Sequence, residues 1–187
     1  MKSRSEDLIE ENSDDNTKFE IELNIEKVQR LDLNYNEIKK IQVDVFRGLN
    51  NLTKIYLIGN KMKFLPENIF SGLNNLKEIY LNHNNTESLP ENIFKGLNSL
   101  IEIYLNDNNL EFLPENIFSG LNSLTDINLN KNKIEYLPEN IFFDLNSLRY
   151  ISLYHNKIEF SYFNILIIRF KRIRSLLDDK GLIFISI

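Results

Sequence analysis

The sequence predicts an α/β solenoid of about six stacked repeats, and three observations support this prediction. The hexapeptide Leu-Pro-Glu-Asn-Ile-Phe occurs four times at one constant spacing, at residues 65–70, 89–94, 113–118 and 137–142. A fixed period of this length is typical of solenoids, in which every unit packs against its neighbours. Two further features recur once per unit: a pair of apolar residues two positions apart, and an asparagine three positions after that pair.

The apolar pair predicts one short strand in each repeat. The repeats span residues 28–162 and begin at residues 28, 52, 76, 100, 124 and 148. The fourth position of each repeat is Leu31 or an isoleucine, the sixth is leucine, and the residue between them is polar or aromatic. This alternation is expected of a half-buried strand. Because the same strand recurs in successive units, all strands run in one direction and the predicted sheet is parallel.

The asparagine at the ninth position of every repeat is predicted to be structural. It follows the strand, where the chain turns and buried backbone groups need new hydrogen-bond partners. An amide side chain both donates and accepts, so it can bind its own turn and the neighbouring repeat together. The predicted asparagine ladder consists of Asn36, Asn60, Asn84, Asn108, Asn132 and Asn156.

Phenylalanine occupies the nineteenth position of the first five repeats, and these rings are expected to stack as a spine away from the sheet. The spine consists of Phe46, Phe70, Phe94, Phe118 and Phe142. Two positions later, glycine in the first four repeats predicts a backbone angle that side chains resist. Asp144 replaces this glycine in the fifth repeat, and aspartate is among the residues that best tolerate such an angle.

These repeats resemble the leucine-rich repeat family in its 24-residue "typical" form, over residues 28–162. The shared features are the spaced leucines, the asparagine and the Leu-Pro-x-x-x-Phe segment. The resemblance implies a curved, right-handed superhelix with a parallel sheet on its concave face and turns or short helical segments on its convex face. In this family the concave face usually binds protein and catalysis is rare, so the resemblance implies a binding module.

Both ends of such a stack need a cover, because the last repeat would otherwise expose its core. Residues 1–17 are acidic and nearly free of apolar residues, which predicts a disordered tail. Residues 18–27 are predicted to form an N-terminal capping strand, since apolar and polar residues alternate over 19–25. Residues 163–187 are predicted to form the C-terminal cap, with an amphipathic helix from Asn164 to about Lys180.

Two other interpretations of the C-terminal region remain open. Its basic amphipathic segment could contact a membrane surface or an acidic partner, or the chain could be truncated there. No segment is long and apolar enough to predict a membrane span. Residues 1–26 hold nine acidic and three basic residues, so the net charge of −5 leaves the remainder of the chain at +1. That balance argues against nucleic acid as a partner.

The sequence favours an intracellular location, because its start lacks the apolar stretch of a signal peptide and it has no cysteine. If the chain is a fragment of a longer protein, an extracellular location is expected instead. In that case the glycosylation sequon at Asn51, completed by Thr53, would be usable.

Eight residues of the predicted concave face are candidate partner contacts. Tyrosine at the fifth position of three successive repeats predicts an aromatic strip, because neighbouring strands lie about 4.8 Å apart. Acidic residues at the third position lie beside it. Tyrosine is enriched at binding hot spots. The candidates are Tyr56, Tyr80, Tyr104, Glu78, Glu102, Asp126, Asn128 and Tyr150.

No catalytic, metal or cofactor site is predicted. His83 and His155 lie three repeats apart, about 14 Å along the stack, so they cannot share a metal ion. Asp107 and Lys131 follow His83 at the same position of the next two repeats, which predicts a row of ion pairs. The repeated glutamates share one environment, whereas a catalytic pair of carboxylates needs unequal ones. No phosphate-binding glycine loop, nucleophile elbow or zinc-protease motif is present.

We therefore predict a protein–protein interaction module that binds a partner of unknown identity on its concave face, without catalysis and without a cofactor. Two alternatives remain open: a fragment of an extracellular receptor or matrix-like protein, and a pathogen effector or decoy that mimics animal repeats. A signal sequence or cysteine cap encoded beyond this chain would favour the first. The abundance of Asn, Ile and Lys would suit the AT-rich genome expected of the second. The oligomeric state also stays open.

Overall fold

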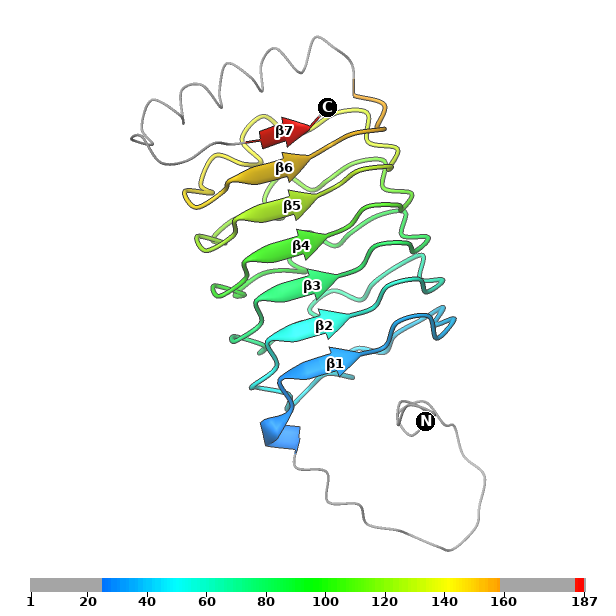
Figure 1. The fold of residues 1–187 in the computed structure, drawn as a ribbon, viewed down its shortest axis with the longest axis vertical. Coiled ribbons are helices and arrows are strands. Elements are labelled where there is room, and N and C mark those ends of the chain that lie inside the picture. Colours follow the sequence, from blue (N-terminus) through cyan, green and yellow to red (C-terminus); the bar gives the residue numbers. More distant parts are fainter. Residues whose placement is uncertain (1–24, 159–183, 187) are drawn as a thin grey trace, which may run out of the picture.

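A computed structural model describes residues 25–158 and 184–186, and these residues build one solenoid with a parallel sheet along one side (Figure 1). The chain enters through a short 3-10 helix, η2 (Ile25–Lys27). Seven short strands then follow in sequential order. The strands are β1 (Arg30–Asp32), β2 (Lys54–Tyr56), β3 (Glu78–Tyr80), β4 (Glu102–Tyr104), β5 (Asp126–Asn128), β6 (Tyr150–Ser152) and β7 (Phe184–Ser186).

The register of the sheet places equivalent positions of successive repeats side by side. Ile55 pairs with Ile79, and Ile79 with Ile103, at the centres of β2, β3 and β4. All pairs are parallel, as the sequence predicts. A residue type that recurs once per repeat therefore becomes a column across the sheet.

The core lies behind the sheet and is continuous from Leu33 to Ile158. The central isoleucine of each strand from β2 to β6 has no exposed surface, and its alternating neighbours point to the other face. Thr86 is the one polar residue in a column of apolar side chains, and it too is fully buried. Its hydroxyl donates to the carbonyl of Met62 at 3.2 Å, so its burial leaves no polar group unpaired.

The phenylalanine spine reveals the curvature of the stack. Successive rings of the spine are nearly parallel, with centroids 6.0 to 6.3 Å apart. On the sheet side, successive tyrosine rings are only 4.6 and 4.7 Å apart. Equivalent groups of equal repeats are thus closer on the sheet side, which makes the sheet the concave face. The predicted stacking of the phenylalanines is confirmed.

Asparagines after the strands join each repeat to the one before it. The Nδ2 of Asn108 donates to the carbonyls of Leu105 in its own repeat, at 3.1 Å, and of Leu81 in the preceding repeat, at 3.0 Å. Its Oδ1 accepts the backbone N–H of Thr86 at 3.0 Å. The same bridge recurs at Asn60, Asn84, Asn132 and Asn156. Asn36, which has no preceding repeat within the described range that starts at residue 25, is exposed and donates to the carbonyl of Asn34.

Two backbone features differ from expectation. Gly48, Gly72, Gly96 and Gly120 have the left-handed φ that their pattern predicts, but Asp144, in the glycine's place, does not. The eighth position of every repeat is also left-handed, with φ between 51° and 67°. Only Gly59 among those six residues is a glycine, so the composition of the column gave no sign of this turn.

The two ends of the solenoid also depart from expectation. Ile25 begins η2 rather than ending a capping strand, and the rest of that predicted strand, 18–24, lies outside the described residues together with the tail 1–17. The helix expected over 164–180 lies outside them as well. Strand β7 was not predicted, although residues 182–187 have apolar residues at the first, fourth and sixth positions of a repeat.

Candidate functional site

Three tyrosines form a stacked strip across the middle of the concave face. Tyr56, Tyr80 and Tyr104 are the last residues of β2, β3 and β4, and register places them side by side. Their ring planes differ by 9° and 4°, and their centroids are 4.6 and 4.7 Å apart. All three side chains are half-buried. We call these residues the tyrosine strip.

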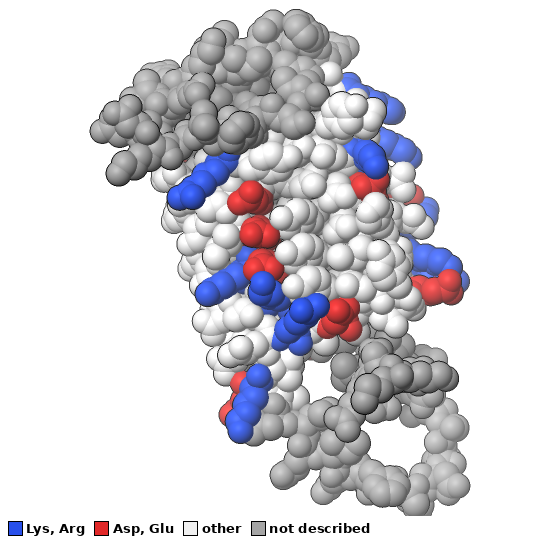
Figure 2. All heavy atoms as spheres, in the orientation of Figure 1, with Lys and Arg blue, Asp and Glu red and all other residues white. Residues whose placement is uncertain are grey.

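A row of acidic side chains follows the sheet (Figure 2) and lies two residues before the tyrosine strip in each strand. Glu78, Glu102 and Asp126 are the first residues of β3, β4 and β5 and are neighbours in register. The Tyr80 hydroxyl lies 3.0 Å from a carboxylate oxygen of Glu78 and donates to it, and it lies 3.5 Å from Glu102. Hydrogen bonds therefore tie the strip to the row, which fixes both in place.

The hydroxyls of Tyr80 and Tyr104 are held in their protonated form. Burial, followed by the hydrogen bond to Glu78, raises the pKa of Tyr80 well above its ordinary value. Burial and the negative charge of Glu102 raise the pKa of Tyr104 to about 12. A phenol that stays protonated remains a hydrogen-bond donor, so both hydroxyls serve the carboxylates beside them.

Cations cover the N-terminal end of this surface. The guanidinium of Arg30 lies 4.4 Å from the centroid of the Tyr56 ring, a distance suited to a cation–π contact. Lys54 places its Nζ 2.7 Å from a carboxylate oxygen of Glu78, and this pair raises the pKa of the lysine. Neither Arg30 nor Lys54 was among the predicted contact residues. Their place at the third position, in line with the acidic row, is the sequence feature that could have identified them.

Asn128 and Tyr150 lie on the same face but outside the stack. Asn128 continues the column of the tyrosine strip in β5, and its Oδ1 accepts the backbone N–H of Asn130. Tyr150 follows Asp126 in register and is half-buried. The structure thus brings six of the eight candidates into one contiguous patch and leaves these two at its C-terminal border.

The side chains at the eighth position of successive repeats form a second polar row. Asp107 lies between His83, whose Nδ1 is 3.8 Å from its carboxylate, and Lys131, whose Nζ is 3.2 Å away. Burial acts to raise the pKa of Asp107, but hydrogen bonds from Asn106 and Lys131 and the charge of His83 outweigh it and lower that pKa. Among residues 25–158 no three His, Asp or Glu side chains are grouped to hold a metal ion. The row is a set of surface ion pairs, as its spacing predicted.

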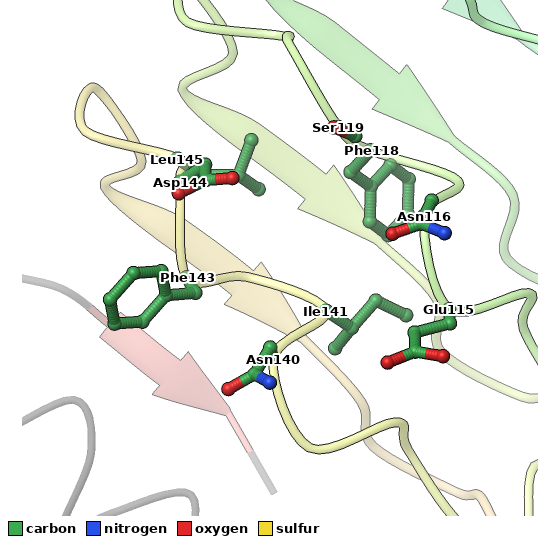
Figure 3. A pocket seen from close by; sticks show the side chains of 9 residues that line it. All are labelled: Glu115, Asn116, Phe118, Ser119, Asn140, Ile141, Phe143, Asp144 and Leu145. Atoms are coloured by element: carbon green, nitrogen blue, oxygen red, sulfur yellow. The ribbon is translucent and has the colours of Figure 1, made fainter.

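Sequence reasoning missed a set of aromatic residues exposed outside the concave face. Three of them share the thirteenth position of their repeats, and we call them the flank aromatics: Phe64, Phe112 and Tyr136. Phe143 is also 69% exposed, and it borders a hollow of about 400 Å³ that also involves Asn116, Asn140 and Ile141 (Figure 3). The hollow lies between turns of two repeats, and none of its residues belongs to the sheet.

Comparisons with known proteins agree on the kind of repeat. A family described as leucine rich repeat matches residues 26–85, 74–134 and 98–158. No curated protein matches the chain. No helix among the described residues has the length and apolarity needed to cross a bilayer.

Solved structures of similar fold include the leucine-rich repeat domain of APL1B, with a TM-score of 0.65 and 26% identity over 70% of this chain. Two structures of the Toll–Spatzle complex of Drosophila also match: one, with TM-score 0.59, is 32% identical over 65% of this chain, and the glycosylated form, with TM-score 0.67, is 30% identical over 70%. The present chain covers 39% of the APL1B chain and 16% and 17% of the other two.

Proposed function

Because the chain belongs to the leucine-rich repeat family, we propose that it is a protein-binding module that holds its partner on the concave face and performs no chemistry of its own. The observation that carries this proposal is the tyrosine strip. Rings already stacked on one another and hydrogen-bonded to neighbouring carboxylates present a large contact area whose side-chain entropy is largely lost before binding.

The open shape of the concave face also favours a protein partner over a small molecule. Small ligands bind in enclosed pockets, whereas the strip and the acidic row lie open on a sheet. The hollow beside Phe143 lies away from this face. The similarity of this chain to structures of the Toll–Spatzle complex points the same way.

Affinity capture with matched variants tests the proposal. The parent chain, a variant with the tyrosine strip replaced by alanine, and a control with the flank aromatics replaced by alanine serve as baits in parallel. A partner of the concave face is expected to be retained by the parent and the control and lost by the strip variant. A partner held equally by all three baits, or lost only by the control, would contradict the proposal.

The captured partner then allows a quantitative test on a single residue. Tyr80→Ala is expected to weaken its affinity by at least about 1 kcal/mol, because a central aromatic contact is removed. This is roughly a fivefold rise in Kd, measured by isothermal titration calorimetry. Equal affinity of Tyr80→Ala and the parent would reject the strip as the contact site.

A second candidate is an extracellular recognition module, which the similarity to the Toll–Spatzle structures favours. Asn51 of the sequon is exposed, although its Nδ2 donates to the carbonyl of Glu26 at 2.6 Å. If the natural protein is secreted, a glycosidase-sensitive increase in mass is expected at Asn51, and Asn51→Gln should abolish it. An unmodified Asn51 in protein taken from its native source would argue against this candidate.

A further inference from the structure

The two ends of the tyrosine strip differ in one respect: the N-terminal end carries the protein's own cations. Arg30 lies on the Tyr56 ring at 4.4 Å, and Lys54 contacts Glu78 at 2.7 Å. Both cations occupy the third position of their repeats, and each reaches the following repeat. The protein thus contains an internal example of what this face accepts, which is a guanidinium on a tyrosine ring and an ammonium against the acidic row.

At the C-terminal end the same places have no cation. The third position changes from Arg30 and Lys54 to carboxylates in β3, β4 and β5. Within the described residues, no Lys or Arg lies within 4.0 Å of a carboxylate oxygen of Glu102 or Asp126. Tyr104 stacks on Tyr80 with one face, and neither a ring nor a guanidinium of residues 25–158 stacks on its other face.

The electrostatics of this end favour an incoming positive charge. Glu102 and Asp126 begin adjacent strands, whose backbones are about 4.8 Å apart, so their charges repel. Glu102 contributes to the raised pKa of Tyr104, which is a sign of negative potential at the ring's edge. Both carboxylates are half-buried, so water and salt screen them less than they would screen fully exposed groups.

We propose that this C-terminal end binds an arginine side chain of the protein partner, with the guanidinium stacked on Tyr104 and hydrogen-bonded to Glu102 and Asp126. The inference rests on the proposed function and names the chemistry of the partner. Arginine fits better than lysine, because a planar guanidinium can stack on a ring while it donates to two carboxylates at once. The Arg30–Tyr56 contact is the same arrangement made within the chain.

A partner-free titration tests this proposal. Three capped pentapeptides, with arginine, lysine or citrulline at the centre between serine and glycine residues, are titrated into the ¹⁵N-labelled full chain and followed by NMR. Citrulline has the shape of arginine without its charge. The arginine peptide is expected to shift the backbone amides of Glu102, Tyr104 and Asp126, to bind at least about tenfold more tightly than the citrulline peptide, and to bind more tightly than the lysine peptide.

Two charge-matched variants complete the experiment. Glu102→Gln with Asp126→Asn keeps the hydrogen-bond acceptors and removes two charges, and it should weaken arginine binding at least about tenfold. Glu111→Gln with Glu115→Gln removes two charges from exposed sites outside the sheet and should bind like the parent. Equal binding of arginine and citrulline, shifts spread over all acidic residues, or equal loss in both variants would overturn the proposal.

The outcome is separable from that of the proposed function. If the arginine peptide fails to bind but alanine in the tyrosine strip abolishes partner capture, the face binds protein by other chemistry and only this inference falls. If the peptide binds as expected but the partner is indifferent to the tyrosine strip, the arginine site stands and the proposed function falls.

Discussion

The solenoid has two aromatic columns, built by the same repetition and placed in opposite surroundings. The phenylalanine spine is buried, with rings 6.0 to 6.3 Å apart and no polar group to satisfy. The tyrosine strip lies on the inner side of the curve, with rings 4.6 and 4.7 Å apart, half-buried and hydrogen-bonded to carboxylates. The spine therefore contributes to stability, whereas the strip presents a surface that is available for contact.

The largest expected effect is on the buried column. Phe94→Ala removes a fully buried ring and leaves a cavity between two neighbouring phenylalanines, so the free energy of unfolding should fall by about 3–5 kcal/mol. Denaturant unfolding followed by circular dichroism measures the loss. Phe143→Ala is the control, since its ring is 69% exposed, and it should change stability by less than about 0.5 kcal/mol. Similar losses from both variants would break the comparison.

The next effect concerns the polar contacts that hold the repeats in line. Asn108→Ala should lower the free energy of unfolding by about 1–3 kcal/mol, because it leaves the buried N–H of Thr86 without a partner and removes one of the two amide donors from the carbonyls of Leu81 and Leu105. Asn36→Ala removes the same side chain where the described residues contain no preceding repeat, and a change below about 0.5 kcal/mol is expected. If thermal melting shows that Asn108→Ala changes stability as little as Asn36→Ala, Asn108 does not stabilise the contact between repeats.

On the concave column a smaller effect on stability is expected. Tyr80→Ala removes stacking and a hydrogen bond from a half-buried surface, and cross-strand contacts of this kind are worth about 0.2–1 kcal/mol each. The melting temperature should therefore fall much less than for Phe94→Ala. A loss as large as that of Phe94→Ala would show that the strip belongs to the core rather than to a binding face.

The smallest expected effect is a pH dependence of the tyrosine strip. The phenylalanine spine cannot show it, because phenylalanine does not titrate. The pKa of Tyr104 is raised to about 12, so its contribution to stability is complete below the ordinary tyrosine pKa of about 10 and is lost as pH rises from there toward 12. The ultraviolet absorbance of phenolate should show a component that titrates toward pH 12 and is missing in Tyr104→Phe. If all tyrosines titrate together near pH 10, the strip is more hydrated than the structure shows.

Much of this arrangement follows from repetition alone. A constant period forces equivalent positions into columns, so the strands, the asparagines, the phenylalanine spine and the tyrosine column could all be assigned in advance. Two predictions failed where repetition breaks, whereas the left-handed turn at the eighth position was missed although it recurs in every repeat. Asp144 does not adopt the glycine conformation, and β7 pairs with β6 although the chain between these two strands is longer than in any other repeat.

Spacing along the chain is enough to establish which residues share a column, because equivalent positions become neighbours in a parallel sheet held in register. How close those neighbours come, and which charges meet, follows only from the folded structure. Curvature brings the rings of Tyr56 and Tyr80 to 4.6 Å, while the closest pair of phenylalanine rings stays 6.0 Å apart. The length of the Arg30 side chain allows its guanidinium to lie on the Tyr56 ring, whereas no such cation lies on Tyr104 among the described residues. The sequence pattern alone does not predict either arrangement.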